Sequence, residues 1–138
     1  MQNFWNENAV TRELARHSIG RKILSAVGSR FMKKKMPKFD LLLDLQDRWG
    51  VSKYILKHGE YDAELCRLVK GFLPPNAVCI DIGANIGFWT IFLVSECKAA
   101  KVFSIEPELS NLNLFRQNID LNSSTAKVEL FANAVGDM

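Results

Sequence analysis

Apolar residues change from a strand-like to a helix-like pattern between residues 78 and 97. The run V-C-I-D-I at 78–82 is apolar and β-branched around one aspartate, which predicts a short strand buried on both faces. The residues from about Gly87 to Cys97 are apolar almost all round, which predicts a buried helix. Gly83 and Gly87 lie in the turn between them. A strand, a glycine turn and a buried helix are typical of the start of a Rossmann-like βαβ unit.

The same alternation continues to the end of the sequence. Residues 101–105 predict a second strand, which must end before Pro107 because proline cannot donate to a strand ladder. Residues 110–121 predict a helix with Ser110 as its N-cap, and residues 127–131 predict a third strand. The expected fold class is therefore α/β, with half of a doubly wound, Rossmann-like sheet in the order βαβαβ.

The first part of the sequence has a different pattern. Residues 9–31 predict basic amphipathic helices that break near Gly20, and two β-like runs, 39–45 and 52–56, predict a hairpin. Residues 61–72 predict a helix before the first Rossmann strand. The positions expected to face inward from these helices are Val10, Leu14, Ile19, Ile23, Val27, Leu65, Leu68, Val69 and Phe72. We expect three segments: a basic helical arm at 1–38, a β-hairpin at 39–59 and a partial Rossmann-like domain at 60–138.

Charge is divided unevenly along the chain, whose net charge is +3. Residues 1–38 contain nine Lys or Arg against two Glu, a net charge of +7, whereas the remaining residues have a net charge of −4. A basic arm can bind nucleic acid or a membrane surface. Because no aromatic residues interleave with the basic ones, we expect instead a solvated helix that packs on the domain, and no nucleic-acid partner.

The composition of the 138 residues, 48% hydrophobic and 24% charged, is that of an ordinary globular domain. The longest apolar run, 86–94, is far shorter than the roughly 20 residues that span a bilayer, and the N-terminus lacks the apolar core of a secretory signal. The three cysteines form no C-x-x-C pair and the two histidines are far apart, so no metal site is expected. We expect a cytoplasmic protein with reduced thiols and no transmembrane segment.

The glycine turn excludes some ligands by its sequence. A nucleoside-triphosphate loop needs a lysine directly after its second glycine, where this chain has Phe88. A dinucleotide loop needs a middle glycine so that its backbone can approach a pyrophosphate, and Asn85 occupies that position. The third pattern, D-x-G-x-x-x-G, is satisfied by Asp81, Gly83 and Gly87. It is the nucleotide loop of class I methyltransferases, whose cofactor S-adenosylmethionine has no phosphate.

Glu106 supplies a second indication. An acid at the carboxyl end of the second strand can accept hydrogen bonds from both hydroxyls of an unphosphorylated ribose, and Glu106 lies 23 residues after Gly83, near the expected separation of about 20. NAD would use the same acid, so Glu106 indicates an adenosine ligand without separating NAD from S-adenosylmethionine. A solvated loop carboxylate before a proline is the structural alternative.

Four segments, in order, resemble the FkbM family of S-adenosylmethionine-dependent methyltransferases. They are V-C-I-D-I-G-A-N-I-G-F-W-T at 78–90, E-P at 106–107, Q-N-I-D-L-N at 117–122 and N-A-V-G-D at 133–137. Upstream, Gly59, Glu60 and Tyr61 match a short G-x-Y segment of the family, although Asp62 stands where the family often has glutamate. The resemblance covers about residues 50 to 138, and nothing in residues 1–38 matches.

The resemblance implies roles for individual residues. Asp81 would support the loop and the methionine amino group, and Glu106 would hold the ribose. The methionine end would be lined by Gly83, Ala84, Asn85 and Gly87, and the adenine would lie by Asn133 or Ala134. Tyr61 and Asp62 are weaker cofactor candidates. Each also has a structural interpretation: Asp81 as a turn cap, Asn85 as a left-handed residue and Asn133 as a turn residue.

The resemblance further implies the Rossmann-like class I methyltransferase fold, here with only its first three sheet strands present. It also implies O-methylation of a hydroxyl on a small-molecule or carbohydrate acceptor. Because the sequence ends after the third strand, we expect a truncated methyltransferase without its acceptor site, with no catalytic residue that can be named, and self-association through the incomplete sheet. Two alternatives stay open. The chain could be an NAD-binding fragment of an oxidoreductase, or a non-catalytic interaction module.

Overall fold

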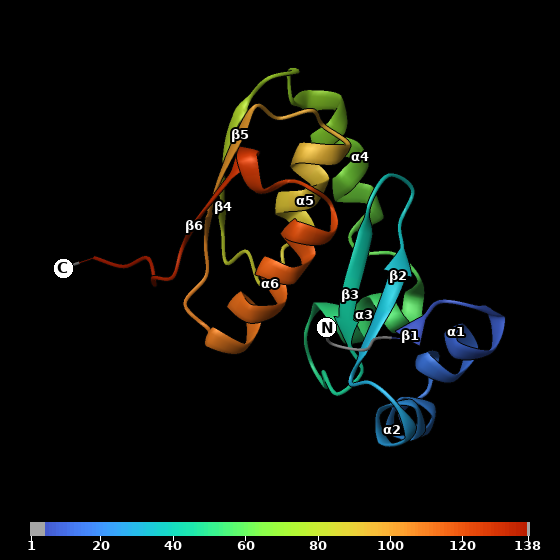
Figure 1. Cartoon of the computed structure of the whole chain (residues 1–138). Coiled ribbons are helices and arrows are strands. Elements are labelled where there is room, and N and C mark those ends of the chain that lie inside the picture. Colours follow the sequence, from blue (N-terminus) through green and yellow to red (C-terminus); the bar gives the residue numbers. More distant parts are fainter. Residues whose placement is uncertain (1–4, 138) are drawn as a thin grey trace. The chain divides into compact units, whose positions relative to one another are not determined.

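The computed structural model describes residues 5–137, and the chain forms two compact units, unit 1 at residues 1–63 and unit 2 at residues 64–138 (Figure 1). The elements of unit 1 are β1 (Trp5–Asn6), α1 (Ala9–Arg16), α2 (Ser18–Val27), β2 (Phe31–Lys35), β3 (Asp40–Asp44) and α3 (Val51–His58). Helix α4 (Ala63–Phe72) begins at the boundary. The further elements of unit 2 are β4 (Val78–Ile82), α5 (Phe88–Ser95), β5 (Lys101–Ile105), α6 (Leu109–Leu121), the 3-10 turn η1 (Thr125–Lys127) and β6 (Val128–Phe131).

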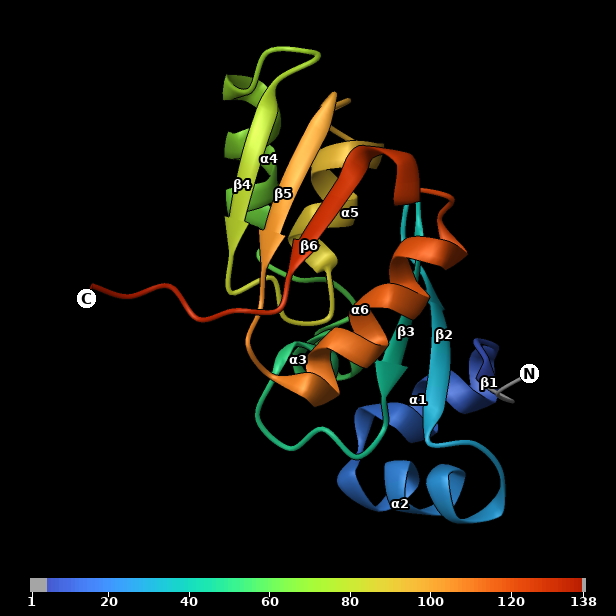
Figure 2. The same cartoon turned by 60° about the vertical axis from the view of Figure 1, so that its left-hand side comes forward.

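Unit 2 is a βαβαβ arrangement, as the sequence predicts. Its sheet has the order β4-β5-β6, and both neighbouring pairs are parallel. Helices α4, α5 and α6 lie on one side of this sheet in both views (Figures 1 and 2). Helix α5 buries nearly every residue, and Leu112, Phe115 and Ile119 of α6 are also buried. The N-cap of α6 is Glu108, so the assignment of Ser110 was wrong.

The opposite face of this sheet is open. Val78, Ile80 and Ile82 of β4 are 65%, 67% and 66% exposed. The register places Ile80 beside Phe103 of β5 and Ile82 beside Ile105, so β4 and β5 form an apolar patch on the open face. The ion pair of Lys101 with Glu129 borders this patch. The prediction that β4 is buried on both faces was therefore wrong. The apolar run V-C-I-D-I does not distinguish a strand covered on one face from one covered on two.

Unit 1 corrects the predicted hairpin. Strand β3 pairs antiparallel with β2, not with residues 52–56, which belong to helix α3. Ser52, Ile55 and Leu56 are buried at helical spacing, and the Asp47 carboxylate accepts hydrogen bonds from the backbone N–H groups of Gly50 and Lys53 at the start of this helix. The β-like composition of residues 52–56 was outweighed by this capping and packing.

The helices of the arm also differ from the expected pattern. The break between α1 and α2 is at His17 rather than Gly20, and residues 31–35 form strand β2 instead of continuing the helical arm. The expected stripes are largely exposed, including Val10 at 68%, Ile19 at 72% and, in α4, Phe72 at 86%. The side chain of Val27 lies outside the described residues. None of the helices described in residues 5–137 combines the length and the apolar composition needed to span a bilayer.

The expectation of self-association stays a prediction, now with a defined surface. Replacing Ile80 by lysine puts a charge within the exposed apolar patch of β4 and β5, and should reduce concentration-dependent association of the chain. Sedimentation velocity over a tenfold range of concentration measures this. Val10→Lys, an exposed apolar position in unit 1, is the matched control. Equal association of wild type and Ile80→Lys would contradict the prediction.

Candidate functional site

The turn between β4 and α5 depends on three residues in the left-handed region of backbone space. Gly83, Asn85 and Gly87 have φ values of +76°, +50° and +90°. Gly87 also packs closely, since a Cβ atom added there would lie 3.0 Å from the Phe115 ring. Gly83 and Gly87 are therefore needed for the backbone conformation of the turn, and Gly87 is also needed for packing.

The backbone N–H groups of the turn are all used within the protein. Those of Gly83 and Ala84 donate to the carbonyl oxygen of Ile105, at N–O distances of 2.9 and 3.0 Å. The Gly87 N–H donates to the Ala84 carbonyl at 2.8 Å. The Asn85 N–H donates to the Glu106 carboxylate, and the next amide, at residue 86, donates to the Asn85 side chain. The turn therefore presents no cluster of free N–H groups of the kind that binds phosphate.

Glu106 is the centre of a hydrogen-bond network at the carboxyl end of β5. Its side chain is buried, with only 5% exposure. Oε2 accepts from the Asn85 N–H at 2.8 Å, and Oε1 accepts from the Glu108 N–H at 2.9 Å and from the Asn111 amide at 3.2 Å. A carboxylate has about four acceptor positions, so three are occupied and the fourth can receive a further donor.

Asp81 is the second carboxylate at this edge. Its Oδ2 accepts a hydrogen bond from the Thr90 hydroxyl at 2.6 Å, and that hydroxyl is 2.8 Å from the Ser104 hydroxyl. Burial raises the pKa of the Asp81 carboxyl above its usual value of 3.8, hydrogen bonds from Thr90 partly oppose this, and the nearby charge of Glu106 raises the pKa further. A cationic group would relieve this repulsion.

Sequence reasoning did not identify the residues that support these carboxylates, namely Thr90, Ser104 and Asn111. One available signal was a threonine in an almost entirely apolar segment, nine residues after Asp81, and the structure shows that this threonine is buried. The parallel register also places Ser104 beside Asp81. These side chains hold the carboxylates in position.

The remaining residues predicted to contact the cofactor lie outside the turn. Asn133 and Ala134 are exposed and follow β6 at the same carboxyl edge of the sheet, and the chain runs there without further strand structure. Two residues before Asn133, the Phe131 carbonyl accepts a hydrogen bond from the Glu106 N–H at 3.1 Å. Tyr61 and Asp62 belong to unit 1, where the Tyr61 ring lies edge-on to Tyr54, with 5.5 Å between centroids. The assignment of all four residues to a cofactor site stays a prediction.

Comparison with known proteins identifies the fold. A P. horikoshii TYW2 structure in complex with MeSAdo is 14% identical, covers 94% of this chain and 51% of that one, and has a TM-score of 0.62. An M. jannaschii TYW2 structure in complex with AdoMet is 23% identical, covers 74% and 42%, and has a TM-score of 0.58. A complex of aTrm5 with tRNALeu is 19% identical, covers 75% and 28%, and also has a TM-score of 0.58. The fold is that of class I methyltransferases.

Sequence comparison gives a narrower result. No protein-family model matches the chain. A segment of 67 residues is 34% identical to the AMB antimetabolite synthetase AmbE of Pseudomonas aeruginosa. That segment is 47% of this chain but only 3% of AmbE. The chain likewise spans about half or less of the solved structures named above.

Three glycine-to-alanine substitutions separate backbone strain from packing. Gly83→Ala adds strain in open space and should lower the free energy of unfolding by about 1–2 kcal/mol. Gly87→Ala adds the contact with Phe115 and should cost roughly 1–3 kcal/mol more. Gly71→Ala, in open space in helix α4, should be neutral or stabilising by up to about 1 kcal/mol. Urea unfolding measures all three. A Gly87→Ala variant no less stable than Gly83→Ala would contradict the packing role.

The raised pKa of Asp81 predicts a specific pH dependence of stability. Above pH 3.8 and up to the raised value, folded Asp81 keeps a proton that the unfolded chain has lost. The free energy of unfolding should therefore fall as the pH rises through this window. Asp81→Asn removes the effect, so its stability relative to wild type should improve from pH 4 towards pH 7. Urea unfolding across this range tests it, with the exposed Asp120→Asn as control. Parallel profiles for wild type and Asp81→Asn would show that Asp81 carries no such penalty.

Proposed function

We propose that unit 2 binds S-adenosylmethionine and that the protein is a methyltransferase dependent on it. The observation that carries this proposal is the combination of a turn whose N–H groups are all satisfied with two carboxylates, Asp81 and Glu106, at the same edge. Such a site suits an unphosphorylated adenosine with a cationic tail. A pyrophosphate at this turn would meet two negative charges, and the N–H groups of residues 83–87 would not be free to bind it.

The residues present fit this cofactor. Glu106 would accept from a ribose hydroxyl at its fourth acceptor position, and Asp81 would face the methionine ammonium. The turn formed by Gly83, Ala84, Asn85 and Gly87 would line the methionine end, with Asn133 or Ala134 beside the adenine. When bound, the cofactor supplies a methyl group on a sulfonium centre. The contribution of this unit is to bind and orient that group, since positioning supplies most of the rate in such a displacement.

The finer proposal is a methyltransferase of FkbM type that acts on a hydroxyl of a small molecule or sugar. It is supported by the four sequence segments at 78–90, 106–107, 117–122 and 133–137, whose order and spacing resemble that family. Segments 78–90 and 106–107 contain the turn and the buried acid described above. No residue of the described chain is assigned as the base that would deprotonate an acceptor.

RNA methylation is the second candidate. Its support is that structures of similar fold include aTrm5 in complex with tRNALeu. The expectation that nucleic acid is not a partner receives no support from these comparisons. The two candidate functions differ in the chemical class of the methyl acceptor, whereas they share the same cofactor site.

Calorimetry with S-adenosylhomocysteine and NAD tests the cofactor. We expect S-adenosylhomocysteine to bind and NAD not to bind. Glu106→Ala should weaken binding by about ten- to a hundredfold, because loss of a charge-assisted hydrogen bond costs roughly 1.5–3 kcal/mol. Asp120→Ala removes an exposed carboxylate of α6 outside this network and should change affinity by less than about twofold.

Because Glu106 also holds the turn, the variants need a structural control. Glu106→Gln keeps one acceptor oxygen, and urea unfolding of both Glu106 variants shows whether unit 2 still folds. NAD binding without S-adenosylhomocysteine binding would replace the proposal with an oxidoreductase. Binding of neither by the folded wild type would favour an interaction module.

A further inference from the structure

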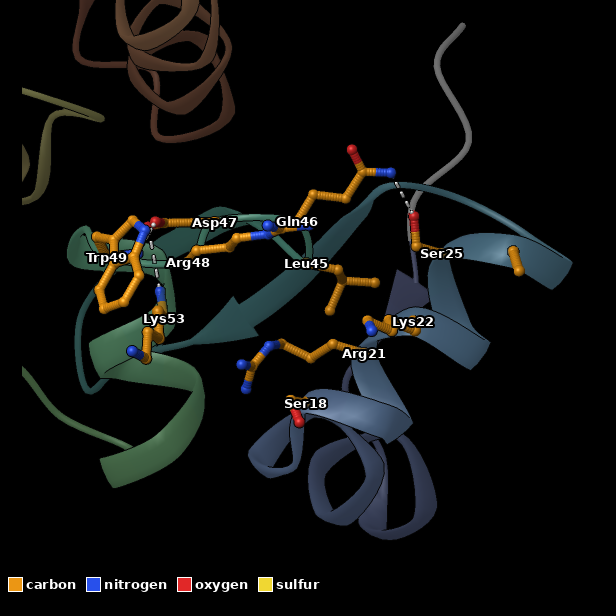
Figure 3. A pocket seen from close by; sticks show the side chains of 11 residues that line it. Ser18, Arg21, Lys22, Ser25, Leu45, Gln46, Asp47, Arg48, Trp49 and Lys53 are labelled. Carbon is orange, nitrogen blue, oxygen red and sulfur yellow. Dashed lines mark hydrogen bonds between the residues drawn. The ribbon is translucent and has the colours of Figure 1, made fainter.

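Unit 1 contains a pocket of about 830 Å³ that has no part in the cofactor site of unit 2 (Figure 3). It lies between α2, the segment that follows β3, and the start of α3. Four basic residues line it: Arg21, Lys22, Arg48 and Lys53. Its one acidic lining residue is Asp47. The pocket therefore combines positive groups that are far apart in the sequence.

The carboxylate of Asp47 is hydrogen-bonded to the backbone. Its carboxylate accepts from the backbone N–H groups of Trp49 at 2.9 Å, Gly50 at 2.7 Å and Lys53 at 3.2 Å. It thereby caps the N-terminal end of α3 and forms no ion pair among the described residues. The four positive charges of the pocket lining exceed the single negative charge of this acid.

The basic residues of the pocket differ from most others in unit 1. Five basic residues elsewhere have a carboxylate partner within 4 Å: Arg12, Arg16, Arg30, Lys33 and Lys34. In the described part of the chain, the side chains of Lys22 and Arg48 have no hydrogen-bond or ion-pair partner. Arg21 is buried and held by bonds from its Nη1 to the carbonyl oxygens of Ala15 and Arg16, which bring no neutralising charge.

Trp49 adds an aromatic surface to this pocket. Its side chain is 90% exposed, the largest exposure among the big apolar residues of the described chain. The Lys53 ammonium lies 4.7 Å from the centroid of the Trp49 ring (Figure 3). An exposed indole beside unpaired cations is suited to a ligand that has both a planar ring and a phosphate.

We propose that this pocket binds nucleotides, with the base stacked on Trp49 and the phosphate against Lys22, Arg48 and Lys53. Ser18 and Ser25, which also line it, offer hydroxyl donors to the sugar or phosphate. The same chemistry is presented by a single strand of RNA and by a free nucleotide. The proposal does not depend on the function of unit 2, because every residue involved belongs to unit 1.

Fluorescence anisotropy with a labelled 12-nucleotide oligouridylate tests the proposal on the whole chain. Uridine avoids the adenosine that the site in unit 2 is proposed to recognise. Trp49→Ala should weaken binding by at least about fivefold, since stacking of one base contributes roughly 1–3 kcal/mol. The double variant Lys22→Ala/Arg48→Ala should weaken it further at low salt. Loss of two phosphate contacts should also flatten the slope of log affinity against log salt by about 1.4.

Lys57→Ala is the matched control, because Lys57 is an exposed lysine of α3 that does not line the pocket. Its affinity should stay within about twofold of wild type. Competition with uridine 5′-monophosphate identifies the source: weak competition indicates an RNA strand, and full competition at similar concentrations indicates a free nucleotide. Absence of oligouridylate binding, or equal effects of Lys57→Ala and the pocket variants, would overturn the proposal. If Trp49→Ala kept full affinity, the binding would be non-specific attraction of a polyanion, and this result would also overturn the proposal.

Discussion

The buried carboxylate of Glu106 determines how the candidate cofactor site is built. A charge with 5% exposure is tolerated only where donors replace its lost water, and Glu106 receives three of them. One comes from Asn85 in the turn after β4, and two come from the residues that lead into and begin α6, Glu108 and Asn111. A single side chain therefore links the segments that follow two neighbouring strands. Glu106 therefore both holds the turn in its conformation and gives the site a negative charge.

The chemistry of the site follows from that arrangement. Because the turn uses its N–H groups on Ile105, on Glu106 and within itself, it has none to offer an anion. The second carboxylate, Asp81, is also partly desolvated, and its raised pKa reflects a charge that lacks full compensation. A ligand that brings hydroxyl donors and positive charge would satisfy both groups. This selection by charge and hydrogen bonding distinguishes an adenosine with a cationic tail from a dinucleotide, although both are compatible with a strand, a glycine turn and a helix.

Sequence patterns predicted unit 2 well where the signal was local. The strand at 78–82, the apolar helix after Gly87 and the strand closed by Pro107 each have a sequence pattern or a residue that favours the element observed there. The contacts of the site were not accessible in this way. The bond between Asn85 and Glu106 joins residues 21 positions apart, and the support of Asp81 by Thr90 depends on how a helix packs on its strand. Periodicity identifies the elements, whereas the partner of each side chain is set by tertiary packing.

Unit 1 shows the same limit for electrostatics. The sequence placed the positive charge in an arm at 1–38, but the fold neutralises much of it locally, as in the pair of Lys34 with Glu7. The unpaired cations that line the pocket include Arg48 and Lys53, which lie beyond that arm. Helix α3 at 51–58 places Lys53 in the pocket lining, because its first turn is held to Asp47 by the Lys53 N–H. The predicted second strand at 52–56 would not have formed this contact. The positive potential that a ligand would meet therefore depends on an element whose type the β-like composition of the sequence concealed.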